Sequence, residues 1–247
     1  MAVTGGARGI GRGIAERFIA EGAKVVLLDI NEARAAETAR EIGSESARCD
    51  VTSSESVQGT IESVVEMLVG LDILVNSAGY SHIAPIEATT EEIWDRTLSI
   101  NLKGMFLMIQ AAIPHLKAAG AGRVINLSSQ SGKKGTGSYS AYCASKFGII
   151  GLTQALAQEF AATGVTVNAI CPGIVFTELW DDAHIAAYGA KRGLDPSEVK
   201  DYLVSGIPMK RAATVDDVAS MAVFLASDES AYMTGQSINV TGGGVMH

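Results

Sequence analysis

The 247-residue chain contains only 5 Pro, 3 Cys and 4 His, and the scarcity of the last two excludes several kinds of site. The cysteines, Cys49, Cys143 and Cys171, are odd in number and scattered, so they form neither a disulfide framework nor a zinc-binding spacing. The histidines also lie far apart. We therefore expect no metal ion held by the protein, and a reducing compartment, the cytoplasm, as its location.

Positively charged residues are also few: the chain has 19 Lys and Arg and 27 Asp and Glu, which gives a net charge of −8. Nucleic acids and anionic membranes are bound by clustered Lys and Arg, so neither is an expected partner. No apolar run reaches the length of about 18 residues that a membrane span needs, and the N-terminus lacks the pattern of a secretion signal. The composition indicates a soluble acidic protein.

Apolar residues are plentiful, at 47% of the chain, which is enough for one large core. Strand-like apolar runs alternate with helical segments, and this predicts a parallel sheet of about seven strands covered by helices on both faces. The whole of 1–247 is expected to form a single α/β domain. The predicted strands are 2–4, 24–29, 47–49, 71–76, 123–127, 165–171 and 237–240, and the predicted helices are 14–20, 32–42, 54–68, 90–119 with a break, 140–160, 196–204 and 215–226.

A glycine-rich turn follows the first predicted strand, with the sequence Thr4-Gly5-Gly6-Ala7-Arg8-Gly9-Ile10-Gly11. Such a turn lets backbone amides approach a pyrophosphate while the next helix dipole stabilises its charge, so it indicates dinucleotide binding and a Rossmann-type, doubly wound fold. A tight structural turn would need the same glycines. Only three residues lie between Met1 and Gly5, where a central strand has about five or six, so we expect that native N-terminal residues are missing.

Asp29 ends the second predicted strand, 18 residues after Gly11. A carboxylate there can accept hydrogen bonds from the adenosine ribose and would repel the 2′-phosphate of NADP, so Asp29 predicts NAD as the cofactor. Arg8 in the glycine turn is a contrary sign, since an arginine can pair with that phosphate, although it can equally pair with a surface acid.

Tyr142 and Lys146 are four residues apart on a predicted helix and so lie on one face. A phenol with a pKa of about 10 is a poor base at neutral pH, but an adjacent ammonium favours the phenolate, and the pair therefore suits general acid–base chemistry. Alone, the spacing is common on solvated helices. Asn101 lies in an apolar helix and needs a hydrogen-bond partner, which either a structural or a catalytic role would supply.

Polar and glycine residues also follow several predicted strands at their carboxyl ends, where parallel α/β sheets bind ligands. Turn chemistry alone would also account for them. Residues 174–210 then break the alternation of helix and strand, and we expect this insertion to be a small lid over a substrate. The groups at the strand ends are Asp50 with Val51, Asn76-Ser77-Ala78-Gly79, Ser128-Ser129 and Pro172-Gly173.

In order and spacing, these motifs resemble the short-chain dehydrogenase/reductase family over essentially the whole chain. Ser77 departs from the family pattern, which has a second Asn there. The resemblance implies that Tyr142 takes the alcohol proton, that Ser129 binds the substrate oxygen, and that Lys146 lowers the pKa of Tyr142 and binds the nicotinamide ribose. Asn101 would hold a water linking Lys146 to solvent.

The resemblance also implies a set of cofactor contacts, in which Thr177 and the backbone of Ile174 would bind the carboxamide. Family members commonly pair the helices near 100–119 and 140–162 across a two-fold axis, and both helices carry apolar residues beyond one face, so a homotetramer is expected. The expected cofactor-binding residues are Gly5, Arg8, Gly9, Ile10, Gly11, Asp29, Asp50, Val51, Asn76, Ala78, Gly79, Tyr142, Lys146, Pro172, Gly173, Ile174 and Thr177.

The lid and the C-terminal segments 188–194, 207–211 and 232–243 resemble the branch of the family that oxidises sorbitol and sorbitol 6-phosphate. We therefore predict NAD-dependent oxidation of a secondary alcohol of a linear sugar alcohol to the ketose, and the reverse reduction, with or without a phosphate on the substrate. The expected substrate contacts are Ser129, Ser131, Tyr142 and Trp180, with His82, Gln130, Glu178 and Asp181 as further ligands for hydroxyls and Lys133, Lys134, Lys191 and Arg192 as ligands for a phosphate.

Three other functions remain open at this stage. Butanediol and acetoin dehydrogenases share the Pro-Gly-Ile-Val run and a lid Trp, here Trp180. A 3-oxoacyl carrier-protein reductase is opposed by Asp29 and by the acidic charge, because that activity usually goes with NADPH and a basic surface. A catalytically dead NAD-sensing domain would be expected to lack part of the set Asn101, Ser129, Tyr142 and Lys146, which is complete here.

Overall fold

Strand β1 (Ala2–Thr4) occupies the middle of a seven-stranded sheet in the computed structural model, which describes residues 1–247. All neighbouring strands are parallel, in the order β3-β2-β1-β4-β5-β6-β7. The chain moves outward from β1 to β3 and then returns to the other side of β1, which creates a switch point between β1 and β4. The remaining strands are β2 (Val26–Asp29), β3 (Glu45–Arg48), β4 (Ile73–Asn76), β5 (Arg123–Leu127), β6 (Thr166–Pro172) and β7 (Ser237–Val240).

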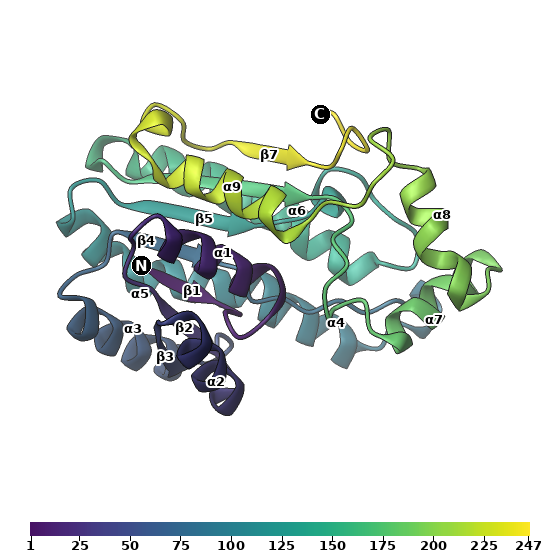
Figure 1. Ribbon diagram of the computed structural model, residues 1–247, viewed down its shortest axis with the longest axis horizontal. Helices are drawn as coiled ribbons and strands as arrows, with labels where there is room; N and C mark the ends of the chain where they lie inside the picture. The colour runs from purple at the N-terminus through teal and green to yellow at the C-terminus, as the bar shows by residue number, and fades with distance from the viewer.

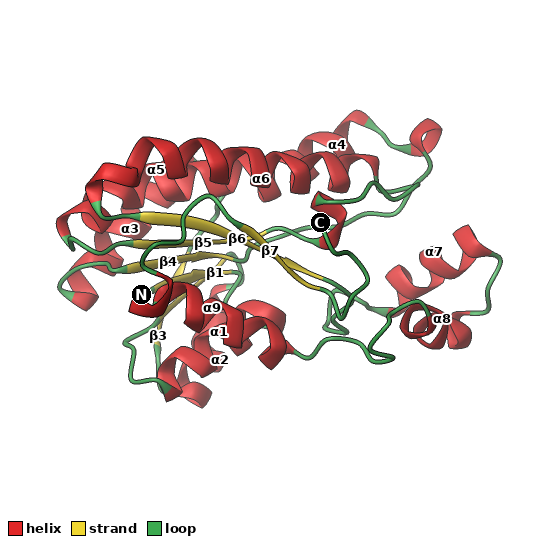
Figure 2. Cartoon of the chain, turned by 90° about the horizontal axis from the view of Figure 1, so that it is seen from above, coloured by secondary structure: helices red, strands yellow, loops and turns green.

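The predicted doubly wound α/β fold is confirmed, and helices cover both faces of the sheet (Figures 1 and 2). One face carries α3 (Ser54–Leu68), α5 (Gly104–Ala118) and α6 (Ser140–Phe160), and the other carries α1 (Gly9–Ala20), α2 (Glu32–Ile42) and α9 (Val215–Ala226). None of the helices has both the length and the apolar character needed to cross a membrane.

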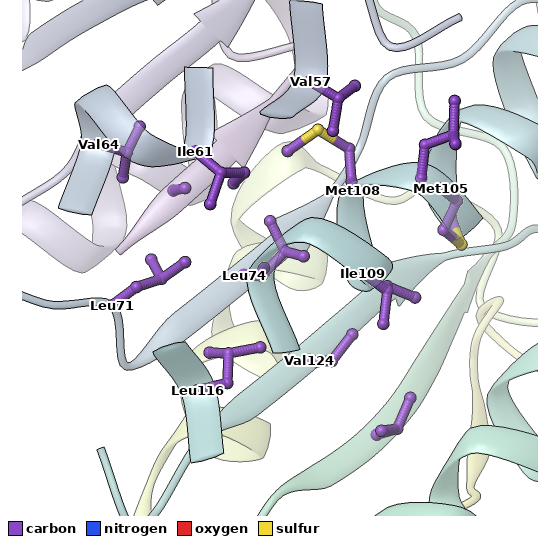
Figure 3. Packing of buried hydrophobic residues seen from close by; sticks show 14 of the residues in the cluster. Val57, Ile61, Val64, Leu71, Leu74, Met105, Met108, Ile109, Leu116 and Val124 are labelled. Atoms are coloured by element: carbon purple, nitrogen blue, oxygen red, sulfur yellow. The ribbon is translucent and has the colours of Figure 1, made fainter. Parts of the chain in front are cut away.

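Successive strand residues pack on opposite faces, so the sheet separates two apolar cores. Leu74 and Val124 belong to the core with α3 and α5, whereas Val75 and Ile125 belong to the core with α1 and α9. Figure 3 shows the first of these cores, where the side chains of α3 and α5 meet above the strands. Burial on both faces explains why the central strands are almost continuously apolar.

The helix predicted over 90–119 contains a break, whose place the sequence did not predict. Residues Glu91–Leu98 form α4, residues Ser99–Lys103 form a π-helical turn, and α5 follows directly. The side chain of Thr90 caps the start by accepting a hydrogen bond from the backbone N–H of Ile93 at 3.2 Å. Single π-helical turns are frequent at functional sites, and this one carries Asn101.

Several predictions about element bounds are wrong. Helix α1 begins at Gly9, five residues before the predicted residue 14. The third strand begins two residues earlier than predicted, at Glu45, and the lid contains two helices where the sequence pattern predicts one. Helix α7 (Asp182–Arg192) precedes α8 (Val199–Ser205), and both project from the carboxyl edge of the sheet (Figure 2). The start and stop signals of α7 are present in the sequence, because Asp181 caps its first turn and Gly193 ends it with a φ of 67°.

Candidate active site

The glycine turn joins β1 to α1 at the carboxyl edge of the sheet. Gly5 has a φ of 62°, and a Cβ atom there would lie 2.9 Å from the Cα of Ala78. A Cβ on Gly11 would overlap the carbonyl oxygen of Gly5. Side chains are thus excluded where the turn meets the N-terminus of α1, and this helix end can receive an anionic group. The residues present fit the pyrophosphate of a dinucleotide.

Asp29 lies beside this turn, as its position at the end of β2 predicts. Its Oδ2 accepts a hydrogen bond from the backbone N–H of Ala7 at 3.2 Å, and its Oδ1 accepts one from that of Asn31 at 3.0 Å. A carboxylate has about four acceptor sites, so capacity for a ribose hydroxyl remains. Arg8 is exposed and forms no ion pair with the protein, so the surface acid offered as its alternative partner is not found.

Two predicted cofactor residues have structural hydrogen bonds. Asp50 accepts bonds from the backbone N–H and the hydroxyl of Thr52 at 2.9 and 2.7 Å, and these bonds hold the pKa of Asp50 below its usual value. Asn76 donates through Nδ2 to Oδ1 of Asn126 at 3.0 Å. The turn chemistry that the sequence leaves open is therefore present at Asp50. Val51, next in the chain, packs against Gly104 of α5.

The segment after β6 comes back over the glycine turn. Gly173 donates its N–H to the carbonyl of Val240 at 2.9 Å, and the carbonyl of Ile174 accepts from Ala213, also at 2.9 Å. A Cβ on Gly9 would lie 3.5 Å from the Cβ of Thr177. Residues from opposite ends of the sequence therefore line one edge of the sheet, and Thr177 lies beside the proposed pyrophosphate site.

Asn101 is fully buried and hydrogen-bonds α6, the helix that carries Tyr142 and Lys146. Its Oδ1 accepts a hydrogen bond from the backbone N–H of Tyr80 at 2.7 Å, and its Nδ2 donates to Oγ of Ser145 at 2.9 Å. Ser145 belongs to α6 and stands between Tyr142 and Lys146 in the chain. The Asn101 side chain therefore links the loop after β4 to α6, the helix that carries Tyr142 and Lys146. This is the structural hydrogen bonding that was one of its two interpretations.

Lys146 points from α6 to the end of β5. Its Nζ donates to the carbonyl of Leu127 at 2.7 Å, and its own carbonyl accepts from Oγ of Ser128 at 2.9 Å. The side chain is almost completely buried, and burial lowers the pKa of Lys146 to about 8. The ammonium lies 5.5 Å from the centre of the Tyr142 ring. The predicted pair on one helix face is therefore present.

Tyr142 is perturbed in the opposite direction from the sequence-based expectation. Burial raises the pKa of Tyr142 to about 12, and a hydrogen bond with the Ser129 side chain lowers it only in part. The expected lowering of the pKa by Lys146 is not found, because the cost of burying a phenolate dominates and the Lys146 ammonium is directed at Leu127. Ser129 and Tyr142 are brought together as predicted.

Sequence reasoning missed two residues near this site: Tyr139, which lies next to Tyr142, and His184, which contacts Tyr139. The hydroxyl of Tyr139 hydrogen-bonds Nε2 of His184 at 3.3 Å, and the rings of Tyr139 and Tyr142 have centres 6.0 Å apart. Trp180, a predicted substrate contact, lies edge-on to His184 at 5.0 Å. The signal for His184 lies in α7, whose start and stop residues predict a helix at this place.

Several other predicted substrate ligands have different partners. Glu178 pairs with Arg34 of α2 at 3.5 Å and lies beside Gly9, so it belongs to the dinucleotide side of the site. Asp181 accepts the N–H of His184 at 2.8 Å and caps α7. Both side chains have partners within the protein, and their contact with a substrate stays a prediction. Ser131 donates its N–H to Oγ of Ser129 at 3.0 Å and so lies beside the predicted substrate-binding serine.

A sheet that presents a dinucleotide turn and a Ser129–Tyr142 pair at one edge defines a dinucleotide-binding oxidoreductase. A family model described as Enoyl-(Acyl carrier protein) reductase matches residues 5–244. The chain belongs to the short-chain dehydrogenase/reductase family, as the motifs indicate.

The relatives include galactitol 2-dehydrogenase of Agrobacterium fabrum, which is 43% identical over 99% of this chain and 96% of the relative. The structure of sorbitol-6-phosphate 2-dehydrogenase from Erwinia amylovora superimposes with a TM-score of 0.96 at 36% identity, covering 100% of this chain and 99% of that one. An NAD⁺-bound xylitol dehydrogenase superimposes with a TM-score of 0.91 at 34% identity, covering 98% and 97% of the two chains.

Proposed function

We propose that this protein oxidises a secondary alcohol of a linear, unphosphorylated sugar alcohol to the ketose with NAD, and catalyses the reverse reduction. The observation that carries the proposal is the Ser129–Tyr142 pair beside a lid whose His184 is hydrogen-bonded to Tyr139 of the main domain. The names of the relatives, which act on galactitol, sorbitol 6-phosphate and xylitol, support a polyol.

Tyr142 acts as the general base during oxidation and as the general acid during reduction. Ser129, bonded to Tyr142, donates to the substrate oxygen and stabilises the charge that develops there. Bound NAD supplies the acceptor for the hydride from the alcohol carbon. Lys146 places a buried cation near the Tyr142 ring, and its low pKa lets it release a proton near neutral pH. Asn101 keeps Ser145, and with it α6, in register.

The cofactor is proposed to be NAD, held by Asp29 at the adenosine end and by the glycine turn at the pyrophosphate. The hydrogen bond from Ala7 keeps the Asp29 carboxylate against the turn, where it would repel a 2′-phosphate. Arg8, which is unpaired, opposes this assignment, because it could neutralise such a phosphate. Relative rates with NAD and NADP decide the question.

The cations offered for a substrate phosphate support an unphosphorylated substrate. Lys191 donates to the carbonyl of Gly137, and its ammonium lies 5.0 Å from the centre of the Tyr139 ring. Arg192 lies over the rings of Tyr188 and Tyr202, at 6.0 and 5.8 Å. These contacts already use part of the bonding capacity of both cations. Lys134 is exposed, and Lys133 is half-buried on the loop after Ser129.

A substrate screen tests the proposal. Galactitol, sorbitol, xylitol, sorbitol 6-phosphate and 2,3-butanediol are compared as alcohols with NAD and NADP, and a 3-oxoacyl thioester is tested in the reductive direction with NADH and NADPH. We expect the highest kcat/KM for a free polyol with NAD. Much faster turnover of butanediol would replace the assignment with the diol dehydrogenase, and preference for the thioester with NADPH would replace it with the carrier-protein reductase. NAD binding without any turnover would indicate the sensor.

We also propose a homotetramer in the cytoplasm. Phe106 on α5 and Phe147 on α6 are 43% and 47% exposed, although large aromatic side chains are usually buried, so the expected interface helices carry apolar surface that a second copy would cover. The three cysteines are all buried and free, which supports a reducing compartment.

A further inference from the structure

Lid helix α7 carries its aromatic and ionisable side chains on one face. His184, Tyr188 and Lys191 are spaced by four and three residues and so share that face, and Trp180 lies just before the capping Asp181. The Trp180 ring lies edge-on to His184 at 5.0 Å and to Tyr188 at 5.9 Å. The lid therefore presents a continuous aromatic surface with one imidazole and one ammonium group in it.

Tyr139 is the residue of the main domain that receives this surface. Its hydroxyl contacts Nε2 of His184 at 3.3 Å, and Lys191 both lies over its ring and donates to Gly137, two residues earlier. Tyr139 is only 8% exposed and precedes Tyr142 by three residues, with ring centres 6.0 Å apart. The lid therefore touches the catalytic helix about one turn from the catalytic phenol.

The backbone next to Tyr139 is held from the opposite side as well. Ser138 has a φ of 61°, a left-handed conformation that residues other than glycine adopt rarely, and such outliers cluster at functional sites. Its carbonyl accepts the N–H of Ala84 at 3.0 Å, and Ile83 packs in the same cluster as Tyr139 and Tyr188. The loop after β4, the loop before α6 and the lid thus converge on Tyr139.

The pair of Tyr139 and His184 is electrically neutral at neutral pH. Burial lowers the pKa of His184 and raises that of Tyr139, so the imidazole is uncharged and the phenol keeps its proton. The charge of Asp181 acts against the lowering at His184, and His82 adds to it. The Nδ1 atom of His184 makes no hydrogen bond within the protein. A neutral donor and acceptor pair of this kind suits hydroxyl groups.

We propose that Tyr139 and His184 determine substrate specificity, by holding α7 closed over the alcohol and by binding a hydroxyl group further along the carbon chain than the reacting carbon and its neighbour. The inference rests on the proposed polyol function and adds two residues to it. Neither residue transfers a proton or a hydride, and the reaction at Ser129 and Tyr142 is unchanged by it.

The test compares Tyr139→Phe and His184→Phe, which remove the hydrogen bond but keep aromatic bulk, with His184→Gln, whose amide can replace Nε2. Steady-state kinetics are measured with the six-carbon polyol that the wild type oxidises best and with the shortest diol or triol that it oxidises. Both Phe variants are expected to lower kcat/KM for the long polyol by about tenfold or more, chiefly through KM, and for the short substrate by less than about threefold. His184→Gln should recover part of the loss.

Equal losses for the long and the short substrate would mean a purely structural role, and unchanged kinetics would mean no role at all. Either result overturns the inference. NAD binding, followed by fluorescence, reports whether each variant is folded and should match the wild type. If the wild type oxidises no polyol, the proposed function fails, and the lid contact is then judged by the rate of proteolysis within 182–205. Tyr139→Phe should raise that rate several-fold, and an unchanged rate overturns the contact.

Discussion

The Nζ atom of Lys146 donates a hydrogen bond of 2.7 Å to the backbone carbonyl of Leu127, the last residue of β5. This bond directs the buried ammonium toward the strand that delivers Ser129. Burial removes water from the Lys146 ammonium, and one carbonyl does not replace that water, so the surroundings disfavour its charge. Keeping Lys146 charged in the folded protein therefore lowers the free energy of unfolding.

That cost predicts the behaviour of Lys146→Met. The pKa of Lys146 is lowered from 10.5 to about 8, and each unit is worth about 1.4 kcal/mol, so at neutral pH the charged form costs on the order of 3 kcal/mol. Losing the hydrogen bond to Leu127 offsets about 1 kcal/mol of that gain in the variant. We expect the variant to be inactive yet more stable by about 1–3 kcal/mol at pH 7, measured by urea unfolding.

The sign of the pH dependence follows from the lowered pKa. Between about pH 8 and 10.5 the folded protein has released the Lys146 proton while the unfolded chain still holds it, so the stability of the wild type rises relative to the variant across this window. The difference measured at pH 7 should therefore shrink toward pH 10.5. Lys134→Met, at an exposed position, is the control and should show no such trend. A gap that is constant with pH would contradict the burial argument.

Tyr142→Phe removes only the ionisable hydroxyl of the catalytic tyrosine. We expect the fold and NAD affinity to be retained and turnover to fall by several orders of magnitude, because the phenol hydroxyl is the group proposed to accept the alcohol proton. Tyr232→Phe is the matched control, since Tyr232 is fully exposed. Near-normal turnover in the Tyr142 variant would place the acid–base group elsewhere.

Asp29→Ser tests the basis of cofactor choice. The wild type should prefer NAD over NADP by at least about tenfold in kcat/KM, and the variant should lose most of that preference because the repulsion of the 2′-phosphate is gone. Adding Arg8→Ala to the variant should then reduce its use of NADP, since Arg8 is the unpaired cation in the turn. Equal rates with both cofactors in the wild type would refute the NAD assignment.

Gly11→Ala and Gly59→Ala place the same methyl group in two helices. At Gly11 it would overlap the carbonyl of Gly5, so we expect loss of NAD binding in fluorescence titration and a lower melting temperature. Nothing lies within 4 Å of the corresponding position at Gly59 on α3, where alanine should stabilise the protein by about 0.5–1 kcal/mol. Retained NAD affinity in Gly11→Ala would remove the glycine turn from the cofactor site.

Assembly is tested by light scattering at micromolar concentration. The chain has a mass of 25.7 kDa, and we expect a particle of four such chains. Phe106→Glu and Phe147→Glu should reduce the mass, because both place a charge on the expected interface, whereas Met67→Glu on α3 should not. A wild-type monomer would contradict the prediction.

The sequence by itself determined the order of the strands and most of the helices, and it placed Ser129, Tyr142 and Lys146 near one another. These features are local: apolar runs have the period of their element, the glycines mark the turn, and four residues bring Tyr142 and Lys146 to one helix face. A break in the helix over 90–119 was predicted, but not its place at Asn101. Helix α7 was not predicted, although its capping Asp181 and terminal Gly193 are both in the sequence.

Only the tertiary structure decided what each polar group bonds to and what that does to its charge. The direction of the pKa shift at Tyr142 depends on how deeply α6 is buried, and burial is set by elements distant in the chain. The position of Glu178 beside Gly9 depends on the return of the segment after β6 over the glycine turn. The contact between Tyr139 and His184 joins residues 45 positions apart, and no local pattern encodes the docking of α7 that creates it.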